Sequence, residues 1–168
     1  MEVYSKVEKL SKSANLSESV YNQAVKLGEA GKIQESLNLL NQIKGNYAKA
    51  KTLYDSMNSF HKKVSLWLGT WKHRGTVNGE KTTYYITFSE VLYKGEPCIK
   101  IKDMNNKSLG YNVEISSKNH ITQIEVGKYM IHFKLKNNHN QKLTYTLLEG
   151  KKMLRELKYE GVTYKTKY

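Results

Sequence analysis

The hydrophobic periodicity of this chain changes once, near Val64. Before that residue, apolar positions recur at helical spacing. After it, apolar and polar residues alternate in about nine short segments that are separated by turn residues. A period of 3.6 is typical of an amphipathic helix, and a period of two is typical of a half-buried strand. The sequence therefore predicts an α+β protein with a helical segment over 1–63 and an antiparallel β domain over 64–168.

The helical segment is expected to contain four helices. Their predicted ranges are 3–14, 17–30, 32–44 and 46–64. Asn15 and Ser17 interrupt the first apolar pattern, and a serine followed by an acidic residue is typical of a helix N-cap. Gly31 and Gly45 stand where the second and third helices should end, because glycine adopts the backbone conformation that closes a helix.

Residues 24–37 resemble a tetratricopeptide repeat, a family of paired antiparallel helices. The positions that carry the resemblance are small at Ala24 and Ser36, large at Leu27 and Leu40, and glycine at Gly31. The resemblance covers about one 34-residue unit, and Asn58 stands one period after Ala24, so there is no second copy in register. It implies a helical hairpin that docks a partner or another copy of the chain. A peptide-binding array needs several such repeats.

The β domain is expected to be a meander of neighbouring strands. Its predicted strands are 65–74, 81–89, 97–103, 109–116, 120–126, 128–136, 142–149, 152–159 and 162–168, with 90–94 left unassigned. Every connection is short, which predicts antiparallel pairing between neighbours. Apolar residues share one side of most strands, so we expect about eight strands to wrap round one core as an up-and-down barrel.

The residues Leu68-Gly69-Thr70-Trp71-Lys72 are similar to the opening Gly-x-Trp strand of the lipocalin and fatty-acid-binding superfamily. In that family the tryptophan plugs the closed end of a barrel, and a late arginine lies across the indole. The resemblance therefore implies that Gly69, Trp71 and Arg155 close the barrel, with Arg155 as a cation–π partner. The Arg-x-Tyr pair that grips a fatty carboxylate is absent, because Leu157 stands two residues after Arg155.

The interior of the predicted barrel is a second candidate site. Aromatic residues are expected there: Trp67, Tyr84, Tyr111, Tyr129, Phe133 and Tyr145. Tyrosine is a good strand former, and a narrow barrel needs bulky side chains to fill it. The same rings could instead contact a small, mostly apolar ligand. Both interpretations stay open at this point.

Catalytic and metal-binding patterns are absent from the sequence. The five histidines form no close His-x-His pair and no His-Glu-x-x-His motif. The lone Cys98 allows no internal disulfide, and a small buried thiol is its expected role. There is no glycine-rich phosphate loop and no nucleophile elbow. We predict a protein that is not an enzyme and that holds no cofactor and no metal.

The net charge of +13 points to an anionic partner. Residues 1–63 carry ten lysines and six acids, and residues 64–168 carry eighteen lysines and arginines and nine acids, so the β domain contributes +9. We favour a protein–protein interaction module: the helical segment docks a protein partner or a second copy, and the basic barrel attracts an acidic surface. The alternative is a carrier of a small apolar ligand in the barrel.

Single-stranded nucleic-acid binding is the least favoured function, because Arg74 and Arg155 are the only arginines and phosphate readers prefer arginine. No run of about eighteen apolar residues occurs, so no membrane span is expected. The lack of a visible signal peptide slightly favours the cytoplasm. A secreted or surface-attached location is the alternative if a leader was removed before Met1, and whether a leader or further helical repeats precede Met1 stays open.

Overall fold

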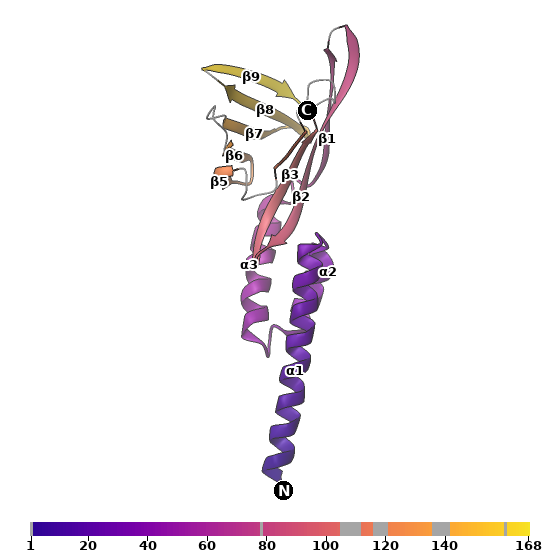
Figure 1. Cartoon of the computed structure of the whole chain (residues 1–168), viewed down its shortest axis with the longest axis vertical. Helices are drawn as coiled ribbons and strands as arrows, with labels where there is room; N and C mark the ends of the chain where they lie inside the picture. The colour runs from indigo at the N-terminus through magenta and orange to yellow at the C-terminus, as the bar shows by residue number, and fades with distance from the viewer. Residues whose placement is uncertain (1, 78, 105–111, 116–120, 136–141, 160) are drawn as a thin grey trace. The chain divides into compact units, whose positions relative to one another are not determined.

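A computed structural model describes residues 2–77, 79–104, 112–115, 121–135, 142–159 and 161–168 (Figure 1). Side chains are described over 13–76, 79–102, 127–131, 142–158 and 161–168. The chain divides into two compact units. The first, here the helical unit, comprises Met1–Lys62 with Glu90–Cys98, and the second, the β unit, comprises Lys63–Ser89 with Ile99–Tyr168.

Three helices are present in the described residues: α1 (Glu2–Glu29), α2 (Ile33–Ile43) and α3 (Ala48–Val64). The prediction of helices in this part of the chain is confirmed, but the predicted break at Asn15 to Ser17 is wrong. Ser17 does not cap a new helix; its Oγ donates a hydrogen bond to the Ser13 carbonyl, 3.1 Å away within α1. This is the back-bonding that serine makes inside a helix. No glycine or proline interrupts residues 2–27, so α1 continues through.

The first corner of the helical unit is a Schellman motif at the end of α1. The Lys32 amide donates to the Leu27 carbonyl at 2.9 Å, and the Gly31 amide donates to the Gly28 carbonyl at 3.0 Å. Gly31 has a φ of 77°, the left-handed conformation that this motif requires of the residue after the helix. The predicted role of Gly31 as a tight corner is confirmed.

We expect Gly31→Ala to lower the free energy of unfolding by about 1–2 kcal/mol, because a Cβ in the left-handed region meets the following carbonyl. Urea unfolding followed by circular dichroism would measure this loss. The matched control is Gly45→Ala: Gly45 does not have a positive φ, and an added Cβ there meets nothing within 4 Å. An equal loss in both variants would contradict the explanation.

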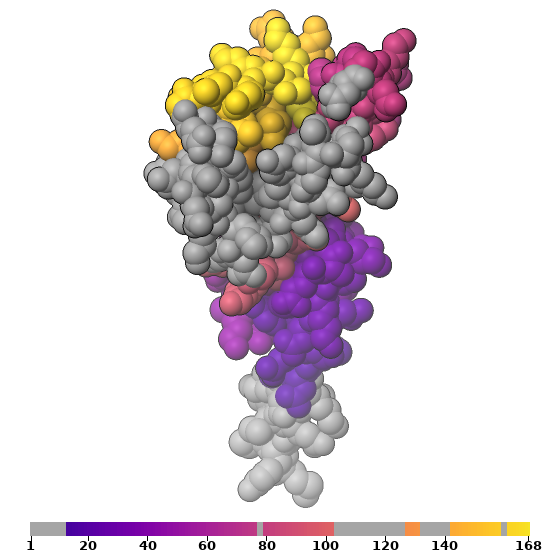
Figure 2. All heavy atoms as spheres, turned by 45° about the horizontal axis from the view of Figure 1, so that its top comes forward, coloured from indigo at the N-terminus to yellow at the C-terminus, as the bar shows by residue number. Residues whose placement is uncertain are grey.

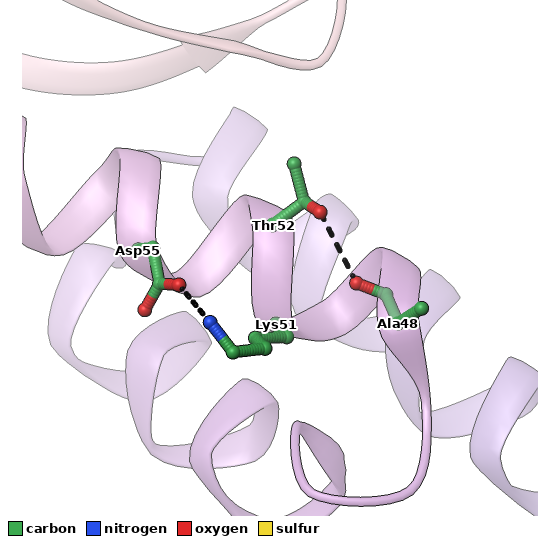
Figure 3. Close-up of polar contacts among 4 residues, drawn as sticks. All are labelled: Ala48, Lys51, Thr52 and Asp55. Atoms are coloured by element: carbon green, nitrogen blue, oxygen red, sulfur yellow. Dashed lines mark hydrogen bonds and ion pairs between the residues drawn. The ribbon is translucent and has the colours of Figure 1, made fainter.

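The core of the helical unit lies between all three helices. Its fully buried members include Ala24, Leu40, Ala50 and Met57. Ser36 Oγ donates to the Ala24 carbonyl at 2.7 Å, so the small residues do lie where α1 and α2 approach. On the exposed side of α3, Lys51 Nζ pairs with Asp55 at 2.7 Å, and Thr52 Oγ1 donates to the Ala48 carbonyl at 3.2 Å (Figure 3). Such i,i+4 contacts add little beyond local helix stability.

The tetratricopeptide-like hairpin is a wrong prediction. The described residues hold three helices rather than one hairpin, and α1, with 28 residues, is much longer than α2, with 11. The unit is instead completed by α3 and by residues 90–98, here the hairpin tip, which join the helices from within the β part of the sequence. Leu92 of the hairpin tip is 2% exposed and belongs to the helical core. A Cβ built on Gly28 would lie 3.0 Å from the Leu92 Cβ, so a larger residue at Gly28 would push the tip away.

Nine strands lie in the described residues, and they form two antiparallel sheets. The first sheet has the order β1 (Gly69–Val77), β2 (Glu80–Tyr93), β3 (Glu96–Met104) and β4 (Asn112–Ile115). The second has the order β5 (Ile121–Val126), β6 (Met130–Leu135), β7 (Lys142–Leu148), β8 (Lys152–Tyr159) and β9 (Val162–Lys167). Within each sheet every strand lies next to its sequence neighbour, as the short connections predict.

The α+β class is confirmed, but the up-and-down barrel is wrong. Among the described strands, β4 does not pair with β5, and β1 and β9 are end strands of different sheets. A barrel exists only when the pairing runs unbroken from the first strand to the last. The lipocalin-like assignment falls with the barrel. One physical reason is that Glu90 and Leu92, which continue the buried side of β2, pack in the helical unit and not in a barrel wall.

The core of the β unit lies between the inner faces of the two sheets. The fully or almost fully buried residues are Trp67, Ile86, Phe88, Ile101, Ile131, Tyr145 and Met153. The rings of Phe88 on β2 and Tyr145 on β7 meet edge to face, with centroids 5.3 Å apart. This contact joins the buried side of β2 to the buried side of β7, whereas cations on the other side of each sheet are exposed.

Candidate functional site

The predicted interior residues do not gather in one place. Trp67 and Tyr145 are both fully buried, and Phe88 lies between them, with its ring centroid 5.5 Å from that of Trp67. Tyr84 is half-buried and stacks on His73 at 5.8 Å. Tyr129 is 57% exposed and lies on the surface. Tyr111 lies outside the described residues, and Phe133 is described only as backbone of β6.

The rings of Trp67, Phe88 and Tyr145 form one buried cluster in the β unit. All three are at most 1% exposed, and Phe88 contacts each of the other two rings. Carriage of an apolar ligand needs a concave, apolar pocket of a few hundred Å³, and this alternative function stays a prediction. A shallow pocket in the described surface lies instead on α1, and its lining is polar: Asn15, Glu18, Ser19, Asn22, Gln23 and Lys26.

The three residues assigned to barrel closure lie in different settings. Gly69 is the exposed first residue of β1, with a φ of 115°. Trp71 is half-buried and donates its Nε1 hydrogen to the Trp67 carbonyl at 2.9 Å. Arg155 is half-buried on β8, directly opposite Tyr145 in the register. A role in closing a barrel presupposes a barrel, and the two sheets are open.

Trp67 is the central tryptophan of the β unit: the sequence placed it among the interior residues but gave the plugging role to Trp71. Its Nε1 donates to the Gly127 carbonyl at 3.1 Å, and its amide donates to the Val64 carbonyl at 2.8 Å. A sequence signal for the central position of Trp67 was its spacing of three residues from Val64. This spacing continues the period of a helix rather than that of a strand. The resemblance to the Gly-x-Trp strand drew attention to Trp71 instead.

The outer face of the first sheet carries a group of exposed cations. Its members on β1, β2 and β3 are Lys72, Arg74, Lys81 and Lys102, with the exposed ring of Tyr85 among them. They alternate with inward residues, so Ile86, Ile101 and Phe88 are buried on the opposite side. We call this set the basic face. Lys72 stands directly opposite Tyr85, with its Nζ 5.9 Å from the ring centroid.

Over the paired stretches 69–76 and 80–88, the acidic residue among the described side chains is Glu80, and it stands opposite Val77 on the other side of the sheet. Arg74 pairs with Thr83 in the register, and Lys81 pairs with Thr76. Arg74 and Lys81 are therefore diagonal neighbours on the same side of the sheet, offset by two residues along the paired strands. Glu114 of β4 stands opposite Lys102 in the register, but its side chain is outside the described set. Like charges on adjacent strands repel each other. An anionic group that binds there would relieve this repulsion.

The outer face of the second sheet is also rich in lysine. Lys142 and Lys158 stand directly opposite each other on β7 and β8, and both are exposed. Glu156 is the acidic residue described on this face, and it pairs with Lys165 Nζ at 3.0 Å. Both solvent-facing sides of the β unit therefore carry an excess of positive charge.

A buried ionisable pair links α3 to the hairpin tip within the helical unit. His61 Nδ1 lies 2.7 Å from Glu90 Oε2, and the Glu90 side chain is only 2% exposed. Its Oε1 has no hydrogen-bond partner in the part of the chain that the structure describes. Burial raises the pKa of the Glu90 carboxyl, and the hydrogen bond and charge of His61 oppose that rise. Its sequence signal is an acidic residue at an apolar position of β2, between Phe88 and Leu92.

The pair alone does not make a metal centre. Over the described ranges, no group of three or more His, Cys, Asp or Glu side chains is placed to hold a metal ion. Nor does any described helix have both the length and the apolar character needed to cross a membrane. No family model, no curated protein and no solved structure matches this chain.

Proposed function

We propose that this chain is a non-enzymatic protein–protein interaction module that binds an acidic partner surface through the β unit. The observation that carries the proposal is the basic face, where Lys72, Arg74 and Lys81 stand on two paired strands with no acidic side chain described among them. Charge complementarity of this kind steers a partner toward the surface and sets its orientation.

An acidic protein fits the basic face better than single-stranded nucleic acid does. Proteins that bind single strands stack successive bases on several exposed aromatic rings. The basic face offers Tyr85 as its exposed ring among the described side chains. Its cations are lysines apart from Arg74, and lysine lacks the planar fork with which arginine recognises phosphate.

Neutralising the basic face should weaken binding to an acidic polypeptide. We expect the triple variant Lys72→Gln, Arg74→Gln and Lys81→Gln to bind poly-L-glutamate about tenfold more weakly, since each exposed charge contributes about 0.5 kcal/mol. Isothermal titration calorimetry at low and moderate salt would measure the change. The matched control, Lys32→Gln with Lys49→Gln and Lys51→Gln, removes the same charge from exposed positions of the helical unit.

Two outcomes would contradict the proposal. If both triple variants lose the same affinity, net charge alone attracts the polyanion and the basic face has no special role. If the unmodified chain binds an oligothymidylate more tightly than poly-L-glutamate at the same salt concentration, the partner is a nucleic acid.

A further inference from the structure

Strand β9 forms one edge of the second sheet. It pairs with β8, and no other described strand pairs with it. Figure 2 shows residues 161–168, in yellow, at the molecular surface. Val162 and Tyr164 are 50% and 53% exposed. An exposed strand edge presents main-chain donors and acceptors to which another strand can add.

The register identifies the residues that present free main-chain groups. Met153 and Tyr168 exchange both of their main-chain hydrogen bonds, at 2.9 and 2.7 Å. In an antiparallel pair, such hydrogen-bonded positions alternate with positions whose N–H and C=O point the other way. Thr166 and Tyr164 therefore bond toward β8, whereas Thr163, Lys165 and Lys167 direct their main-chain groups away from the sheet.

The side chains of β9 differ between its two faces. Val162 and Tyr164 share the inner side of the sheet, because Tyr164 stands opposite Leu157, which in turn stands opposite the buried Leu143. Lys165 and Lys167 share the outer side with Glu156 and Lys158. An added strand would therefore meet apolar side chains on one face and a surplus of positive charge on the other.

We propose that the edge of β9 accepts an extended segment of the partner protein in which apolar residues alternate with acidic residues. This proposal rests on the proposed function and names the form of the acidic partner. Main-chain pairing at Thr163, Lys165 and Lys167 supplies the geometry, and the lysines select the sign of charge. A second copy of the chain is disfavoured, because its β9 would bring lysines against lysines.

The test uses a blocked peptide of alternating valine and glutamate and two variants of one position. Lys165→Ala removes the charge but keeps the outward amide, and Lys165→Pro removes both. Neither change deletes a bond to β8, since the Lys165 amide points away from that strand, which is where proline is tolerated in a sheet. We expect the alanine variant to bind about threefold more weakly and the proline variant about tenfold more weakly again, as the loss of a main-chain hydrogen bond requires.

Amide hydrogen exchange in the unmodified chain gives a second readout that does not depend on how the proline variant folds. The peptide should slow exchange at Thr163, Lys165 and Lys167. Equal binding by the two Lys165 variants, together with unchanged exchange at these amides, would overturn the edge proposal. The proposed function would still stand if the basic-face variant weakened poly-L-glutamate binding. Protection of the same amides in a dimer of the free chain would also overturn the edge proposal.

Discussion

Replacement of Trp67 by alanine is expected to cost about 3–5 kcal/mol of unfolding free energy, the usual range for deleting a large buried aromatic side chain. Trp67 is fully buried, its ring contacts Phe88, and its Nε1 hydrogen bonds the Gly127 carbonyl. The substitution therefore removes core volume and also leaves a carbonyl without its donor. Urea unfolding monitored by far-ultraviolet circular dichroism would measure the loss.

Two companion variants make this expectation specific to Trp67. Trp67→Phe keeps a ring against Phe88 and loses the N–H donor, so about 1–3 kcal/mol should be lost. Trp71→Ala alters a half-buried side chain and should cost less than Trp67→Ala. A larger loss at Trp71 than at Trp67 would mean that the packing described for the β unit is wrong.

Glu90→Gln is expected to change how stability depends on pH. The pKa of Glu90 is raised from its ordinary value of 4.5, mainly because burial disfavours the charged carboxylate. The folded chain therefore holds this proton more tightly than the unfolded chain. The stability that comes from this bound proton is fully present below the pKa that Glu90 has in the unfolded chain. It is lost as the pH rises through the pKa that Glu90 has in the folded chain. Glutamine stays neutral, so unmodified protein should lose stability relative to Glu90→Gln as pH rises from about 4 toward neutrality.

The measurement is the difference in unfolding free energy between the unmodified protein and Glu90→Gln across that pH range. Taking the difference cancels the contributions of the other groups, which titrate in both proteins. The partner variant His61→Ala removes the group 2.7 Å from Glu90 Oε2 and should cost about 1–3 kcal/mol at neutral pH. That cost should shrink in acid, where the carboxyl is protonated. A difference between Glu90→Gln and the unmodified protein that does not vary with pH would show that Glu90 is not buried as described.

Some features of the candidate surfaces follow from alternation alone. The pattern of β1 places Lys72 and Arg74 on one side, and the buried positions Ile99, Ile101, Leu143 and Tyr145 also follow the period of two. The proximity of Arg74 to Lys81 depends on the β1–β2 register, and the free main-chain groups of Lys165 depend on which strand ends the sheet. The register of a strand pair and the strand that ends a sheet are properties of the folded molecule, so residue patterns supply neither fact.

The wrong and missed predictions share one cause: each local motif was interpreted without the residues that surround it in the folded chain. Ser17 has the side chain of a cap, but an uninterrupted helix on both sides lets its hydroxyl bond backward along the helix to Ser13. Gly69 and Trp71 match the opening of a barrel strand, yet a barrel also requires the remote strands to meet. Glu90 occupies an apolar position of β2, and its neighbour His61 comes from a helix 29 residues away in the sequence.

Residue patterns were enough to predict the local structure: the change from helical to alternating period near Val64, the corner at Gly31 and the adjacency of successive strands within each sheet. These features depend on residues within one or two turns of each other, whose steric and hydrophobic preferences act before distant contacts form. Three outcomes emerged only in the folded molecule: the sheets stay open, Trp67 rather than Trp71 is fully buried, and the hairpin tip joins the helices. These outcomes depend on which segments, far apart in the sequence, bury apolar area against one another. That choice depends on the packing of the whole chain.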